Sequence, residues 1–159
     1  MTLALDGVRV VDLTQVMAGP FCTMLLGDLG ADVIKVEPPG RGDLSRSMGG
    51  ARLRLTDDDH APFLALNRNK RSIVLDLKAA ADLERLLELV RTADVLVESF
   101  RPGVAHRLGI GFESVATVNP RLVYASISGF GQTGPYADRP GFDLIAQGMA
   151  GVLIVTGTP

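Results

Sequence analysis

Three glycines near the end of the sequence have the spacing of a phosphate-binding loop. Gly129, Gly131 and Gly134 form a G-x-G-x-x-G pattern directly after an apolar run at residues 122–127. In a dinucleotide-binding enzyme the third glycine of this pattern lies in a helix whose N-terminus faces the pyrophosphate. Here Pro135 and Pro140 follow closely, so no helix continues through the segment. We interpret residues 128–135 as a substrate or lid loop rather than an NAD site, and a plain structural connection fits the composition equally well.

The elements that must position this loop alternate along the chain between strands and helices. Apolar, β-branched runs predict strands at residues 8–13, 32–37, 72–76, 95–98 and 122–127. Helical spacing and turn signals predict helices at residues 18–30, 79–92, 103–108, 112–118 and 143–151, with a long loop at 41–62. This alternation predicts an α/β domain with a doubly wound, mostly parallel Rossmann-like sheet and helices on both faces.

Composition and charge exclude several classes of function. The 159 residues are 47% hydrophobic and 21% charged, and the net charge of −2 indicates no bulk affinity for nucleic acid or an anionic membrane. No apolar run has the length of a membrane span, the N-terminus lacks a signal-peptide pattern, and Cys22 is the single cysteine, so we expect a cytoplasmic location. His60 and His106 lie far apart in the sequence without further ligands at suitable spacing, so no metal site is expected.

The loops that follow the predicted strands have a composition suited to ligand binding. In a doubly wound sheet, ligands bind beyond the carboxyl ends of the strands. Those ends lead here into TQVMAGP, EPPGRGD, DLKAAA, ESFRPG and SGFGQTGP. An ordinary glycine- and proline-rich turn would explain any one of these loops, but the whole set favours a binding site.

These loops and the strands before them resemble a known family. The segments AGPFCTMLLGDLGADVIKVEPPG, NRNKRSIVLDLK, ADVLVESFRPGVAHRLG and NPRLVYASISGFGQTGPYADRPGFD together resemble the family III CoA-transferases, whose fold the α-methylacyl-CoA racemases share. The resemblance extends over residues 5–151. It implies transfer of coenzyme A from an acyl-CoA to a carboxylic acid. It also implies a dimer of interlocked ring-like subunits and no prosthetic group, because coenzyme A is itself a substrate.

The chains of that family are longer than this one. Residues 1–159 resemble the N-terminal part of the large CoA-binding Rossmann-like domain, without the family's small domain and its C-terminal return segment. The resemblance therefore implies either a homodimer or a complex with a chain that supplies the C-terminal part.

Coenzyme A consists of phosphates, an adenine and a pantetheine arm. Its phosphates require cations or helix N-termini, and its adenine requires an apolar slot. Lys78 precedes a predicted helix, where an ammonium group opposes the helix dipole unless an anion binds there. Without the resemblance, a solvated lysine is the favoured interpretation of Lys78. The alternatives for the other two residues are a core side chain for Phe100 and a surface charge for Arg107. For Lys70 and Arg71, structural ion pairs are favoured over a phosphate or nucleic-acid patch. The CoA-binding residues that the resemblance implies are Gln15, Met17, Ala18, Leu75, Asp76, Leu77, Lys78, Ser99, Phe100, Arg101 and Arg107.

The resemblance also implies covalent catalysis through a mixed anhydride between an aspartate and the acyl group. That aspartate lies in a glycine-flanked G-D motif, expected beyond Pro159. Asp143 begins a predicted helix, where a carboxylate stabilises the helix N-terminus, and the resemblance implies a supporting role beside the nucleophile.

Phe142 stands where the racemases carry a histidine base, which favours a transferase over a racemase. A non-catalytic CoA-binding fragment or subunit also fits the sequence, whereas the prolines after the glycine pattern disfavour a redox Rossmann protein.

Overall fold

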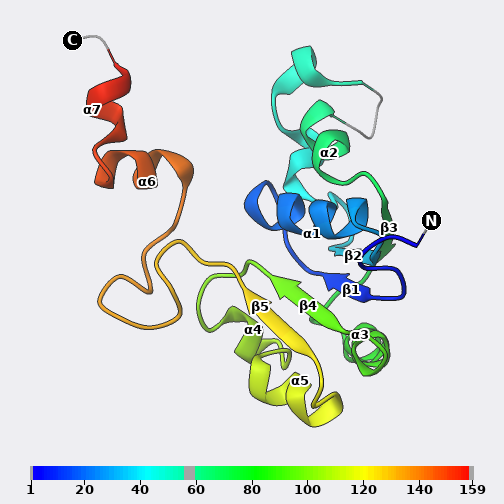
Figure 1. The fold of residues 1–159 in the computed structure, drawn as a ribbon. Helices are drawn as coiled ribbons and strands as arrows, with labels where there is room; N and C mark the ends of the chain where they lie inside the picture. Colours follow the sequence, from blue (N-terminus) through cyan, green and yellow to red (C-terminus); the bar gives the residue numbers. More distant parts are fainter. Residues whose placement is uncertain (1, 56–59, 158–159) are drawn as a thin grey trace.

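A parallel sheet organises the chain in the computed structural model, which describes residues 2–55 and 60–157 (Figure 1). The strands are β1 (Arg9–Asp12), β2 (Asp32–Glu37), β3 (Lys70–Val74), β4 (Val95–Glu98) and β5 (Val123–Ser126). The α-helices are α1 (Ala18–Asp28), α2 (Ala61–Leu66), α3 (Ala80–Arg91), α4 (Val104–Arg107), α5 (Phe112–Val118), α6 (Asp143–Met149) and α7 (Val152–Thr156). The short 3-10 helices are η1 (Leu44–Ser47) and η2 (Gly50–Leu53).

The strand order confirms the predicted doubly wound fold. Neighbouring strands pair in the order β3-β2-β1-β4-β5, and every pair is parallel. Val11 of β1 lies opposite Ile34 of β2 on one side and Leu96 of β4 on the other. Strands β2 and β3 are added on one side of β1, and β4 and β5 are then added on the other side. The order therefore reverses between β1 and β4, and the loops after these two strands diverge there.

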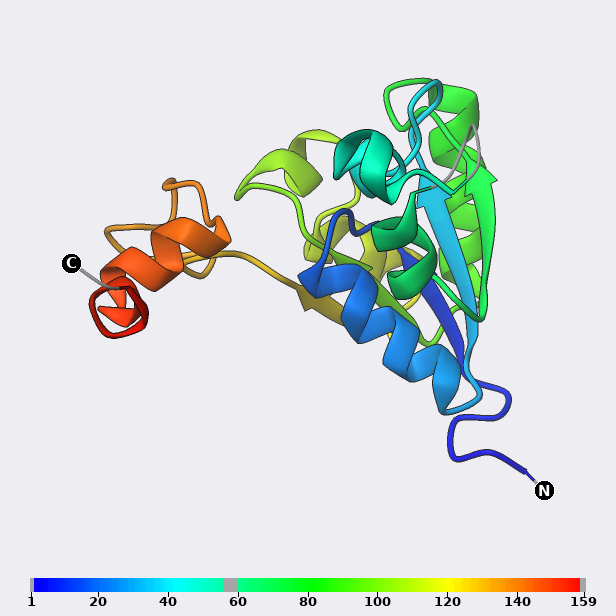
Figure 2. The same cartoon turned by 90° about the horizontal axis from the view of Figure 1, so that it is seen from above.

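Successive residues of β1 belong to two different cores, because side chains alternate across a strand. Val11 is fully buried in a cluster with Leu86 of α3 and Val115 of α5. Val10 is fully buried in a second cluster, against which Leu26 of α1 packs. Figure 2 shows α1 and α2 on one face of the sheet and α3 and α5 on the other, so helices cover both faces as predicted.

The structure corrects the predicted elements in three places. β3 begins at Lys70 and ends at Val74, two residues earlier than predicted, so Asp76 lies in the following turn. The predicted loop at 41–62 contains η1, η2 and the start of α2, and its residues 56–59 lie outside the described residues. The helix predicted at 143–151 ends at Met149, and a further helix that was not predicted, α7, begins after Gly151, which adopts a left-handed conformation (φ 74°).

Helices α6 and α7 pack on each other and lie away from the sheet in both views (Figure 1, Figure 2). Their apolar side chains are largely exposed, for example Leu144 at 70% and Ile154 at 84%. Over the described residues, every helix is too short or too polar to cross a membrane.

Candidate functional site

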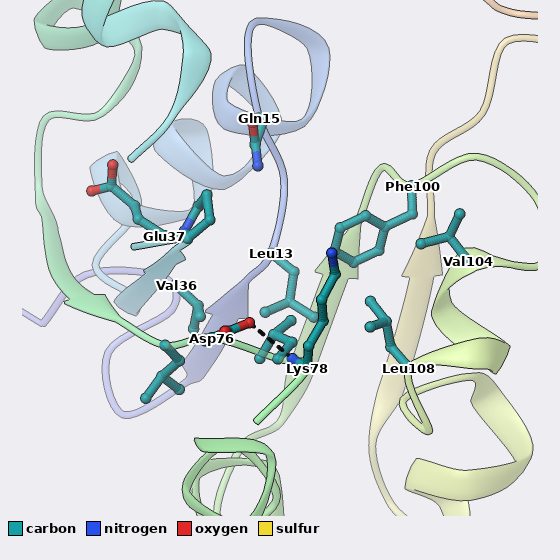
Figure 3. A pocket seen from close by; sticks show the side chains of 12 residues that line it. Leu13, Gln15, Val36, Glu37, Asp76, Lys78, Phe100, Val104 and Leu108 are labelled. Carbon is teal, nitrogen blue, oxygen red and sulfur yellow. Dashed lines mark hydrogen bonds between the residues drawn. The ribbon is translucent and has the colours of Figure 1, made fainter. Parts of the chain in front are cut away.

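A hollow of about 280 Å³ lies beyond the carboxyl ends of β1, β2 and β4, where the strand order reverses (Figure 3). Ligand sites of doubly wound sheets occur at this position. The wall combines residues at the strand ends with the turn after β3 and with helix α4. The lining residues are Leu13, Gln15, Val36, Glu37, Pro38, Leu75, Asp76, Leu77, Lys78, Phe100, Val104 and Leu108.

The hollow brings together six of the residues predicted to bind CoA. Gln15 comes from the loop after β1, and Phe100 comes from the loop after β4. The other four form the continuous segment 75–78, which leads from β3 to α3. Phe100 is half-buried and also packs against the larger core cluster, as expected for a core side chain, while its contact with CoA stays a prediction.

The other five predicted residues do not line the hollow. Met17 and Ala18 are exposed at the start of α1, and Arg101 is exposed in the loop before α4. Arg107 is exposed on α4, whereas Val104 of α4 and Leu108, directly after this helix, line the hollow. Ser99 joins two loops, because its hydroxyl accepts the backbone N–H of Gln15 at 3.3 Å.

A carboxylate at or near the end of each of four strands fixes the loop that follows. Asp12 accepts the backbone N–H of Thr14 at 2.9 Å, and Glu98 accepts that of Phe100 at 2.7 Å. Glu37 accepts the N–H of Asp43 at 2.8 Å, and Asp76 accepts that of Lys78 at 3.0 Å. These bonds give the loops around the hollow a defined shape without any ligand.

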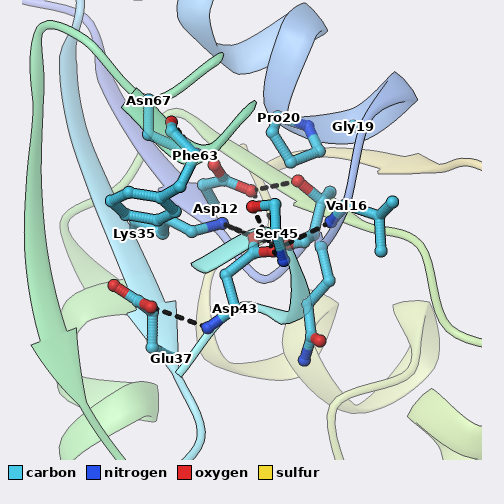
Figure 4. A network of polar contacts seen from close by, with 12 residues as sticks. Asp12, Val16, Gly19, Pro20, Lys35, Glu37, Asp43, Ser45, Phe63 and Asn67 are labelled. Carbon is cyan, nitrogen blue, oxygen red and sulfur yellow. Dashed lines mark hydrogen bonds and ion pairs between the residues drawn. The ribbon is translucent and has the colours of Figure 1, made fainter. Parts of the chain in front are cut away.

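A buried network of charges lies beneath the loop after β1 (Figure 4). Lys35 pairs with Asp43 at 2.7 Å, and Lys70 pairs with Asp12 at 3.1 Å, with each of these side chains at most 1% exposed. Lys35 also donates to the carbonyl of Thr14 at 2.9 Å, and Lys70 donates to that of Pro20 at 2.9 Å. The two lysines therefore hold both ends of the segment 14–20.

The prediction that Lys70 and Arg71 form structural ion pairs is confirmed. Lys70 is paired with Asp12 within the network, and Arg71 forms an ion pair with Asp32 at 2.6 Å. Sequence reasoning missed the network as a whole. Its one local signal is the presence of the charged residues Asp12 and Lys35 inside otherwise apolar strands, because a charge in such a place requires a partner.

The pKa values in this region follow from burial and pairing. Burial would raise the pKa of Asp43, but the ion pair with Lys35 and hydrogen bonds from Ser45 lower it. Burial lowers the pKa of Lys70, and the Asp12 carboxylate offsets only part of that effect. Burial would also raise the pKa of Glu37, but hydrogen bonds from Arg46 and other donors bring that pKa to about 2.

The glycine-rich loop at residues 128–142 connects β5 to α6, and two of its glycines allow its ends to approach each other closely. The backbone of Gly129 lies so close to that of Gly141 that a Cβ on either residue would overlap the other. Phe130 packs edge-on against Tyr136, with 5.9 Å between the ring centroids. The loop therefore closes on itself. Asp143 follows as the first residue of α6, where it accepts a hydrogen bond from Gln147 at 2.6 Å, away from the hollow.

Comparison with known proteins assigns nearly the whole chain to a protein family. Residues 5–159 match the family model described as CoA-transferase family III. The chain belongs to CoA-transferase family III. The fold and the recognition of the N-terminal motifs are thereby confirmed, because the match covers nearly the whole chain.

Relatives in CoA-transferase family III are similar to this chain over almost all of its length. The acetyl-CoA:oxalate CoA-transferase of Acetobacter aceti is 53% identical over 97% of this chain and 39% of its own. The formyl-CoA:oxalate CoA-transferase of Rhodopseudomonas palustris (strain BisA53) is 50% identical over 99% of this chain and 36% of its own. A CAIB/BAIF family protein from Brucella suis superimposes with a TM-score of 0.92 at 44% identity, covering all of this chain and 42% of that one. The chain thus spans about two-fifths of the length of these relatives.

Half of the lining of the hollow in this family III chain was not predicted from sequence. Strand-end residues such as Leu13 and Val36 have the pattern of core residues, and only the packing shows that their side chains border a hollow. Pro38 directly follows a strand, at the edge where a site is expected, and this position is the signal that could have found it. Within the described residues, no group of three or more His, Cys, Asp or Glu side chains is placed to hold a metal ion.

Proposed function

We propose that the protein transfers coenzyme A from an acyl-CoA to a carboxylic acid, and that this chain supplies the hollow that binds the CoA. The observation that carries the proposal is the family match together with the place of the hollow, at the reversal of strand order in a doubly wound sheet. The relatives from Acetobacter and Rhodopseudomonas are both CoA-transferases, with oxalate as one partner of the exchange. The proposed substrates of this protein are accordingly an acyl-CoA and a small carboxylic acid.

Lys78 is the proposed contact for a CoA phosphate. Among the described lining residues it is the one lysine or arginine, and its exposed side chain precedes the N-terminus of the twelve-residue helix α3. The N-cap residue Ala79 provides no side-chain hydrogen bond to that helix. An anion beside Lys78 would be attracted by both the ammonium group and the helix dipole, which otherwise repel each other.

The remaining roles follow from position. The ring of Phe100 borders the hollow and offers an apolar surface for the adenine. Arg101 and Arg107 are exposed beside it and are proposed to reach phosphates outside the hollow. Gln15, Met17 and Ala18 are proposed to face the thioester end, because they lie in the loop after β1 and at the start of α1, where the strand order reverses.

The proposed chemistry is covalent catalysis by an aspartate. One carboxylate oxygen attacks the thioester carbonyl, the C–S bond breaks, and CoA leaves as a thiolate, so that a mixed anhydride remains. CoA thiolate then attacks the aspartyl carbonyl of the anhydride, which releases the donor acid and leaves an aspartyl-CoA thioester. The acceptor carboxylate attacks that thioester and expels CoA thiolate, which gives a second anhydride. Attack of the thiolate on the acceptor's carbonyl forms the new acyl-CoA and regenerates the aspartate carboxylate. We place the nucleophile beyond residue 159 and give Asp143 a supporting role. A homodimer, or a chain that carries the rest of the fold, is the proposed partner.

The binding proposal is tested by calorimetry with free CoA. Lys78→Ala and Arg107→Ala should each weaken CoA binding by about 1–2 kcal/mol, which is about five- to thirtyfold, because each removes a charge-assisted contact. Lys78→Arg should retain most of the affinity.

Arg91→Ala is the matched control, because Arg91 is an exposed cation in the last turn of α3, at the opposite end of that helix from Lys78. Its CoA affinity should equal that of the wild type. Unchanged affinity in both Lys78→Ala and Arg107→Ala would contradict the assignment of the hollow to CoA.

A further inference from the structure

Val16 has a backbone conformation that its side chain disfavours. Its φ is 72°, in the left-handed region, where a β-branched residue is a genuine outlier. The other non-glycine residue with positive φ among those described is Asn69, a type that tolerates this region. Such strain persists only where surrounding contacts hold it, and it is concentrated at functional sites.

Three side chains hold the backbone around Val16. The N–H of Val16 donates to Oδ1 of Asp43 at 3.1 Å. On its N-terminal side, the N–H of Gln15 donates to Ser99, and the carbonyl of Thr14 accepts a hydrogen bond from Lys35. Consecutive residues are thus fixed by groups from β2, from the loop after β2 and from the loop after β4.

Asp43 is itself held firmly in place. Its side chain is fully buried, its Oδ2 pairs with Lys35, and its Oδ1 also accepts the N–H and the hydroxyl of Ser45. Its own N–H donates to Glu37. Asp43 does not line the hollow, so any effect of this carboxylate on a ligand passes through Val16 and its neighbours.

We propose that Asp43 is a positioning residue, which holds Val16 in its left-handed conformation and thereby presents Gln15 and the adjoining loop to bound CoA. The proposal rests on the proposed function, because the loop matters to CoA only if the hollow binds it. Without the acceptor on Asp43, Val16 relaxes to an ordinary conformation, and the backbone direction at Gln15 and Met17 changes.

The test replaces the buried ion pair as a whole in the full protein. Lys35→Met with Asp43→Leu removes the acceptor, and the Lys35 hydrogen bond to the carbonyl of Thr14 with it, without leaving an unpaired buried charge. The Val16→Gly arm below separates the two losses, because glycine relieves only the strain at residue 16. Without CoA, this double variant should show faster deuterium exchange at residues 14–20. Its CoA affinity should be about tenfold weaker, on the scale of one lost charge-assisted contact. Adding Val16→Gly should restore the affinity to within about threefold of the wild type, because glycine adopts positive φ without strain.

Asp43→Asn is the second variant, since it keeps the shape and an acceptor for Val16. Its free energy of unfolding should fall, because Lys35 keeps a buried charge without its partner, but the folded variant should retain the CoA affinity to within about threefold. Asp32→Asn is the matched control, because Asp32 forms ion pairs at the opposite end of β2. Exchange at residues 14–20 should stay unchanged in this control.

The outcomes separate this proposal from the proposed function. If the wild type does not bind CoA, the proposed function fails, and exchange alone decides the positioning role: faster exchange in the double variant supports it and unchanged exchange overturns it. If the wild type binds CoA, unchanged affinity in the double variant overturns the proposal. An affinity loss that Val16→Gly does not repair, or a tenfold loss in folded Asp43→Asn, also overturns it.

Discussion

The carboxylate of Glu37 offers a quantitative test of the contacts at the end of β2. Its side chain is 2% exposed, and it accepts hydrogen bonds from Arg46 Nε at 2.7 Å and from the N–H of Asp43 at 2.8 Å. Burial would raise the pKa of Glu37, but donors from Arg46, Ser72 and Asp43 outweigh it and lower the pKa from 4.5 to about 2. At about 1.4 kcal/mol per pH unit, this difference corresponds to at most on the order of 3 kcal/mol of stability.

The sign of the pH dependence follows from the direction of that change. Because the pKa is lower in the folded state, the contribution of Glu37 is fully present above the unfolded-state pKa of 4.5 and is lost as the pH falls to about 2. Glu37→Gln should therefore lower the free energy of unfolding at neutral pH by up to about 3 kcal/mol. The difference from the wild type should shrink through that window, as measured by urea unfolding at a series of pH values.

Glu88→Gln is the matched control, because Glu88 forms an ion pair with Arg91 at a site where its side chain is 63% exposed. This change should alter stability by no more than about 0.5 kcal/mol at any pH. A loss in Glu37→Gln that stays constant between neutral pH and about pH 2.5 would refute the reasoning, because the carboxylate charge would then contribute nothing.

Two further predictions concern the loop after β1 and the reaction. Gly19→Ala should destabilise the protein by about 1–3 kcal/mol in urea unfolding, because a Cβ on Gly19 would overlap the buried side chain of Thr14. Gly148→Ala, which meets Leu153 only at an ordinary 3.6 Å, should not destabilise it, and a loss as large as that of Gly19→Ala would contradict the steric argument. In deuterated water, 2-methylacyl-CoA substrates should keep their α-hydrogen, because the ring of Phe142 cannot carry a proton. Deuterium incorporation at enzymatic rates, followed by mass spectrometry, would favour a racemase.

Local patterns in the sequence were sufficient to predict most of the fold. The β-branched run at 32–37 predicted β2 with its observed bounds, and the apolar spacing around Leu86 and Val90 placed α3 to within one residue at each end. Strands alternating with helices then predicted the parallel, doubly wound sheet. Lys78 was recognised as a candidate from its place before a predicted helix, whereas the resemblance to the family III CoA-transferases singled out Leu75, Asp76 and Leu77. Each of these signals is carried by residues close together in the chain.

The tertiary structure alone decided which side chains meet. Lys70 and Asp12 pair across 58 positions of sequence, and Gln15 meets Ser99 across 84. The burial of Asp12, Lys35, Asp43 and Lys70 in a network beneath one loop depends on the strand order, in which β1 lies between β2 and β4. The strained conformation of Val16 likewise has no local signal, because its own propensity opposes it. Hydrophobic periodicity specifies which face of an element is buried, whereas pairing among buried charges depends on distances that only the assembled sheet sets.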